Sequence, residues 1–142
     1  MLKVTEILKD PITVKGRKVQ EVRTYSIRTE RMNDNCLPIR YAQSLMIWID
    51  KDGYIGEMES IFPIQTDENI EFAFSSNIVK EQGFPQLQIK EKNMDIKVKN
   101  TEKGFILLFS DDRRINRIIE CGDVKFYCLD QFVIALEAMI SM

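Results

Sequence analysis

The chain contains no histidine and only three cysteines among its 142 residues. Without an imidazole, it lacks the side chain that most often activates a serine or cysteine nucleophile. A closed zinc site needs about four Cys or His ligands, so three cysteines predict no metal centre. A glycine-rich phosphate-binding loop is also missing. These absences favour a protein without metal or cofactor, and a binding role over an enzymatic one.

Long apolar runs are missing as well. No stretch reaches the roughly eighteen apolar residues that a membrane span requires, and Lys3 and Glu6 interrupt the N-terminal segment where a secretory signal would be apolar. Cys36, Cys121 and Cys128 are odd in number and irregular in spacing, which argues against a disulfide framework. We therefore expect a cytosolic protein with three unpaired thiols.

Composition predicts one soluble domain over residues 1–142. The hydrophobic content of 44% is enough for one core, and 30% of the residues are charged. A pI near 5.3 disfavours direct nucleic-acid binding, because phosphate backbones attract clustered Lys and Arg.

Apolar residues mostly recur at every second position, which is the period of strands with one buried face. The turns Lys51–Gly53 and Thr101–Gly104 contain the glycine that tight hairpins favour. This pattern predicts an antiparallel β-meander of about eight to ten strands. The expected strands are Leu2–Leu8, Val19–Arg28, Ser44–Asp50, Tyr54–Phe62, Asn69–Phe74, Gln86–Lys90, Met94–Lys99, Phe105–Ser110, Arg114–Glu120 and Val124–Cys128.

The C-terminus departs from this period. Its apolar residues fall on one helical stripe after Asp130, an acceptable N-cap, and predict an α-helix packed on the sheet. The stripe consists of Leu129, Phe132, Val133, Leu136, Met139 and Ile140. A short helix is expected at Asn77–Gln82, and Thr29–Gln43 is expected to be a loop. The predicted fold class is therefore α+β.

Two segments, Ile47–Met58 and Leu107–Ile118, share the order of apolar strand, acidic turn and apolar strand. We interpret them as two similar hairpins of one sheet.

Acidic residues are concentrated between Asp50 and Glu71, where seven acids and one base give a local charge of −6 in a chain of net charge −2. Charges gathered on one surface can steer a basic partner. If Leu45, Ile47 and Ile49 face inward, alternation turns Trp48 outward as an interface anchor; otherwise Trp48 is core. The predicted partner-binding residues are Trp48, Asp50, Asp52, Glu57, Glu59, Asp67, Glu68 and Glu71. An ordinary solvated face is the alternative.

Other readings of these acids are weaker. The segment Asp50–Gly53 begins like a calcium loop, but Tyr54 and Ile61 stand where such a loop needs oxygen ligands, so a hairpin turn fits better. Glu57 and Glu59 project from the same face of one strand and could form an acid/base pair, although nothing marks an apolar pocket around them.

Near the C-terminus, the segment Lys125–Glu137 reads as a strand that runs directly into a helix. Together with the chain's size, acidic segment and missing catalytic groups, this segment resembles the immunity proteins of bacterial polymorphic toxin and contact-dependent growth inhibition systems. The resemblance implies a cytosolic inhibitor that binds one toxin domain, commonly a basic nuclease.

Two other classes of function remain open. A small enzyme could use carboxylates or Tyr25, Tyr41 and Tyr54 as acid/base groups. A structural or regulatory subunit could pair through an exposed sheet edge, and a homodimer is compatible with that alternative.

Overall fold

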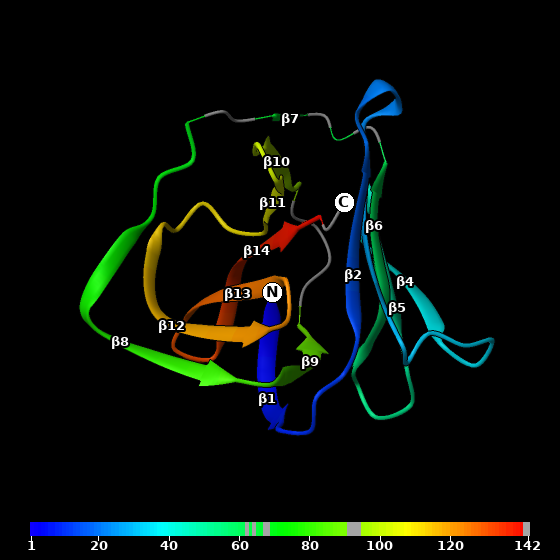
Figure 1. Cartoon of the computed structure of the whole chain (residues 1–142), viewed down its shortest axis with the longest axis horizontal. Helices are drawn as coiled ribbons and strands as arrows, with labels where there is room; N and C mark the ends of the chain where they lie inside the picture. Colours follow the sequence, from blue (N-terminus) through cyan, green and yellow to red (C-terminus); the bar gives the residue numbers. More distant parts are fainter. Residues whose placement is uncertain (62, 64, 67–68, 91–94, 141–142) are drawn as a thin grey trace.

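The computed structural model describes the whole chain except residues 62, 64, 67–68, 91–94 and 141–142. Two β-sheets lie against each other (Figure 1). The five-stranded sheet contains β2 (Val14–Val19), β3 (Thr24–Thr29), β4 (Leu37–Ala42), β5 (Leu45–Ile49) and β6 (Ile55–Ile61). The nine-stranded sheet contains β1 (Leu2–Leu8), β7 (Gln65–Thr66), β8 (Ala73–Gln82), β9 (Phe84–Ile89), β10 (Lys97–Asn100), β11 (Gly104–Leu108), β12 (Arg114–Cys121), β13 (Val124–Leu129) and β14 (Phe132–Met139). A single 3-10 turn, Gln20–Val22, connects β2 and β3.

The five-stranded sheet is antiparallel throughout, in the order β2-β3-β6-β5-β4. The larger sheet follows the order β7-β10-β11-β14-β13-β12-β8, and β1 pairs with both β14 and β9. Strands β8 and β9 are joined only by Gly83, whose N–H donates to the carbonyl of Glu120 at 2.9 Å. The pairing therefore closes into a ring. It runs from β1 through β14, β13 and β12 to β8, and β8 continues through Gly83 into β9, which pairs with β1.

The main core lies between the two sheets and takes residues from both. Tyr25 of β3 packs on Phe105 of β11 with ring centroids 5.4 Å apart, and its hydroxyl accepts a hydrogen bond from Asn100 Nδ2 at 2.9 Å. Gly16 of β2 lies so close to Ala138 that an added Cβ would meet the Ala138 Cβ at 3.1 Å. These contacts fix the inner face of the smaller sheet against the larger one.

A second apolar cluster covers the opposite face of the nine-stranded sheet. Ile106 and Leu108 of β11 and Ile134 of β14 contribute to it, while Phe105, Leu107 and Leu136 of the same strands belong to the main core. The middle of the larger sheet is therefore buried on both faces.

The predicted C-terminal helix is wrong, and with it the α+β fold class. Among the described residues there is no α-helix, and Phe132–Met139 forms strand β14. Asp130, interpreted as a helix cap, adopts a left-handed φ of 55° in the two-residue turn between β13 and β14. A strand buried on both faces loses its period of two, because both alternating sets of side chains are apolar. In Phe132–Met139 the resulting run of apolar residues also contains the spacing of an amphipathic helix, which is why the sequence predicted one.

Two further local expectations are wrong. Asn77–Gln82 belongs to strand β8 and not to a helix, and the expected loop Thr29–Gln43 contains strand β4. The strand expected at Asn69–Phe74 is extended only from Ala73 onward, where β8 begins. The ends of two expected strands, Phe62 and Met94, lie outside the described residues.

The interpretation of two similar hairpins holds only for the first copy. Ile47–Met58 lies across the β5–β6 hairpin, with Lys51–Gly53 at its turn. In the second copy, β11 pairs with β10 and β14, whereas β12 pairs with β13 and β8. The expected strand at Arg114–Glu120 is confirmed, but its pairing is not.

The unpaired state of the cysteines is confirmed: Cys36, Cys121 and Cys128 are all free and buried. Burial raises the pKa of the Cys128 thiol to about 12. Among the described residues, no helix is long and apolar enough to cross a membrane.

Candidate functional site

The five-stranded sheet has one face in the core and one face of exposed or half-buried side chains. On strands β2 and β3 this outer face carries Lys15, Arg17, Ser26 and Arg28; on β4, β5 and β6 it carries Arg40, Met46, Trp48, Glu57, Glu59 and Ile61. In Figure 1 the sheet is seen close to edge-on at the right, and the nine-stranded sheet lies on its inner side.

Trp48 and Met46 point to this outer face. Leu45 and Ile47 of the same strand are fully buried against the core, so the alternation of a strand places Met46 and Trp48 on the other side. The two outward side chains are half-buried. The outward orientation considered for Trp48 is therefore the observed one, and Trp48 is not a core residue.

A groove with a volume of about 160 Å³ lies along this part of the face. Its lining combines apolar and charged side chains: Arg40, Gln43, Ser44, Met46, Trp48, Glu59 and Ile61. Met46 is the cross-strand neighbour of both Arg40 and Glu59, and Ile61 is 45% exposed. An apolar surface bordered by charges is the arrangement expected of a protein interface.

Glu57 and Glu59 share this face but differ in their surroundings. Glu57 Oε1 lies 3.7 Å from Arg28 Nη1, in an ion pair across to β3. Glu59 faces Ser26 at the equivalent position of β3, and among the described residues its carboxylate has no basic partner. The two carboxylates are therefore not equivalent.

Asp50 has a structural role at the turn between β5 and β6. Its Oδ1 accepts hydrogen bonds from the N–H groups of Asp52 at 2.9 Å and Tyr54 at 3.0 Å, and its Oδ2 lies 2.8 Å from Arg31 Nη1. Burial raises the pKa of Asp50, but the bonds from Tyr54, Arg31 and Asp52 outweigh it, and the net pKa is lowered. The Arg31 guanidinium also lies 4.3 Å above the Tyr54 ring centroid.

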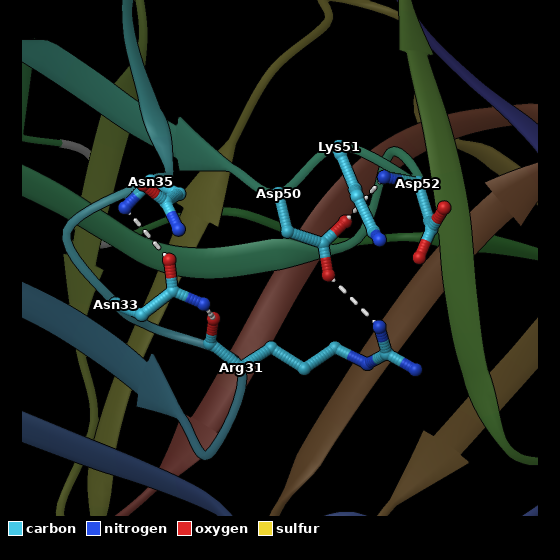
Figure 2. Close-up of a pocket in the computed structure, with 6 residues that line it drawn as sticks. All are labelled: Arg31, Asn33, Asn35, Asp50, Lys51 and Asp52. Atoms are coloured by element: carbon cyan, nitrogen blue, oxygen red, sulfur yellow. Dashed lines mark hydrogen bonds and ion pairs between the residues drawn. The ribbon is translucent and has the colours of Figure 1, made fainter.

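A second hollow lies beside this turn (Figure 2), with a volume of about 340 Å³. Its lining comes from the β3–β4 connection and from the turn: Arg31, Asn33, Asn35, Asp50, Lys51 and Asp52. Figure 2 shows Lys51 and Asp52 reaching in from the turn and Arg31 from the opposite side. Two cations face two anions, so this pocket offers no preference for a ligand of one sign.

The predicted acidic residues do not gather on one surface. Asp50 and Asp52 lie at the turn, Glu57 and Glu59 lie on the outer face, and Glu71 is exposed beside Phe72, which packs on the second cluster of the larger sheet. Asp67 and Glu68 lie outside the described residues. Whether any of these acids binds a partner stays a prediction.

The basic residues of the same face were not predicted from the sequence. Lys15, Arg17, Arg28 and Arg40 come from strands that are distant from Asp50–Glu71 in the chain. The alternation of basic residues within β2 and β3 could have indicated a shared face of these two strands. The pairing of β3 with β6 could not be predicted from spacing alone.

The tyrosines considered as acid/base groups of an enzyme do not lie together in one site. Tyr25 and Tyr41 are buried in the core, and Tyr54 lies beneath the Arg31 guanidinium. Within the described part of the chain, no three His, Cys, Asp or Glu side chains are grouped so as to hold a metal ion.

Comparison with known protein-family models and with curated proteins finds no match for this chain.

Proposed function

We propose that this protein is a protein-binding inhibitor that docks through the outer face of its five-stranded sheet. One observation carries the proposal: Trp48 and Met46 point away from the core, on a strand whose alternate residues Leu45 and Ile47 are fully buried. Tryptophan is strongly enriched among the residues that dominate binding energy at interfaces.

The proposed inhibitor is a cytosolic immunity protein, and its partner is a toxin domain with a basic surface. The carboxylate of Glu59 supports a basic partner, because it borders the groove without a cation of its own among the described residues. The bases of the same face restrict this preference to the region around β5 and β6. A uniformly basic surface would be repelled by Lys15, Arg17 and Arg28.

Co-expression with the product of the adjacent upstream gene, followed by a toxicity assay, tests the proposal. The intact protein should restore growth, and Trp48→Ala should lose this protection while remaining folded. Phe74→Ala is the matched control, since Phe74 is an aromatic residue with 52% exposure on the other sheet. Equal protection by the parent, Trp48→Ala and Phe74→Ala would remove this face from the interface. Failure of the parent to protect would reject the immunity function.

A further inference from the structure

Glu57 and Glu59 form a natural pair for comparison, because they lie two residues apart on β6 and project from the same face. Arg28 neutralises Glu57 from β3, where Glu59 has only Ser26 opposite. On the β5 side, Trp48 is the neighbour of Glu57 and Met46 is the neighbour of Glu59. The face therefore contains one carboxylate that is already paired and one that is not.

We propose that the groove beside Glu59 receives an arginine or lysine side chain of the protein partner. This inference rests on the proposed function and names the chemistry that the face recognises. Met46 and Ile61 offer apolar surface to the methylene stem of such a side chain. The Trp48 ring attracts the cationic head through its electron-rich face, and Glu59 supplies the opposite charge.

Arg40 lines the same groove, but among the described residues no ion pair joins it to Glu59. The two residues flank Met46 from β4 and β6, so their backbones lie two strand spacings apart, roughly 10 Å. Arg40 Nη1 instead donates to the backbone carbonyl of Gln43 at 2.9 Å, which holds the guanidinium at the end of its own hairpin. A cation from outside can therefore reach Glu59 between these strands.

The intrinsic fluorescence of Trp48 provides a direct readout, because it is the only tryptophan in the chain. The probe is N-acetyl-argininamide, and its neutral isostere, the citrulline derivative, is the control ligand. The arginine probe should change Trp48 emission saturably at millimolar concentration, and the citrulline probe should not. Equal responses to the two probes would overturn the proposal.

The two glutamates supply matched variants for the same titration. Glu59→Gln should weaken binding of the arginine probe about two- to fivefold, the range for one exposed ion pair. Glu57→Gln should change it by less, because that carboxylate already has Arg28. Thermal melts of both variants establish that they remain folded. Equal losses in the two variants, or no loss in either, would contradict the assignment of Glu59.

Failure of this inference can be distinguished from failure of the proposed function. If Trp48→Ala weakens binding of the toxin domain while Glu59→Gln and Glu57→Gln behave alike, the docking face stands and the cation pocket is rejected. If Trp48→Ala leaves toxin binding unchanged, the docking face itself is rejected.

Discussion

The two sheets differ in how much of their surface is covered. Strands β11 and β14 of the nine-stranded sheet contribute side chains to apolar clusters on both of its faces. The five-stranded sheet contributes to the main core from one face only, and its other face carries exposed or half-buried side chains. Packing on both sides therefore constrains the residues of the larger sheet, whereas packing constrains only one side of the smaller sheet.

If the proposed function is right, this difference separates the residues that stabilise the fold from those that bind the partner. Substitutions in the doubly covered strands should act on the free energy of unfolding, because each buried side chain there contributes about 1.5–3 kcal/mol. Substitutions on the outer face of the smaller sheet should act mainly on binding, since surface changes usually alter stability by about 0.5 kcal/mol or less.

The largest effect is expected for Leu136→Asp in β14, where Leu136 has no exposed surface. An unpaired carboxylate in the core costs several kcal/mol, about as much as the whole stability margin of a typical domain. This variant should be unfolded by circular dichroism at room temperature. Met46→Asp is the contrasting variant, and it should melt close to the parent. Similar melting temperatures for the two would contradict the distinction between the sheets.

Gly83→Ala is expected to be the next most damaging change, because it alters the corner that joins β8 to β9. Gly83 has a φ of +146°, and an added Cβ would lie 2.5 Å from Ile7 Cγ2 and 2.6 Å from the Leu8 carbonyl oxygen. We expect a loss of about 3 kcal/mol in urea unfolding. Gly122→Ala is the control that has backbone strain without a steric clash. Gly122 has a φ of +57° and no atom lies within 4 Å of an added Cβ, so this variant should lose only about 1 kcal/mol of stability. The account of the corner fails if the two variants lose equal stability.

Asp50→Asn tests the turn at the end of the smaller sheet. The lowered pKa of Asp50 means that its carboxylate stabilises the fold above its ordinary pKa of 3.8, and that this contribution disappears as the pH falls through the lowered value. At neutral pH the variant should lose about 1 kcal/mol, and its stability should fall less between pH 5 and about 2 than that of the parent. A parent-like acid profile for Asp50→Asn would refute this role.

The double reversal of Glu57 and Glu59 to lysine should have the smallest effect on stability. Charges at the edge of an interface act chiefly on the encounter rate, so association with a basic toxin domain should slow and lose part of its salt dependence. Stopped-flow measurements at several salt concentrations measure both quantities. Unchanged rates at every salt concentration would identify these carboxylates as ordinary solvated groups.

Part of this fold could be predicted from the sequence. The period of two located β1 and β5 in full and most of β12. It left open whether Trp48 faces outward or lies in the core, and the burial of Leu45 and Ile47 decides for the outward orientation. The same rule failed at β14, because a strand buried on both faces has apolar residues at both alternating sets of positions. Local spacing also carries no information about the parallel pairing of β8 with β12, which depends on residues about forty positions apart.

The sequence predicted the site residues that lie close together in the chain, but not their partners on other strands. Glu57, Glu59 and Trp48 were identified because they lie on one hairpin. The ion pair of Glu57 with Arg28 and the unpaired position of Glu59 depend on the antiparallel pairing of β3 and β6. The acidic segment Asp50–Glu71 was interpreted as one surface, whereas the folding of the chain places its described members in separate regions.

The most direct test of the central claim is the dissociation constant of the toxin domain for the parent and for Trp48→Ala, measured by calorimetry beside thermal melts of both proteins. The account predicts affinity weakened at least tenfold, consistent with an interface anchor worth about 2 kcal/mol, and a free energy of unfolding within about 1 kcal/mol of the parent. Parent-like affinity in a folded Trp48→Ala variant would contradict the claim that the outer face of the five-stranded sheet is the binding surface.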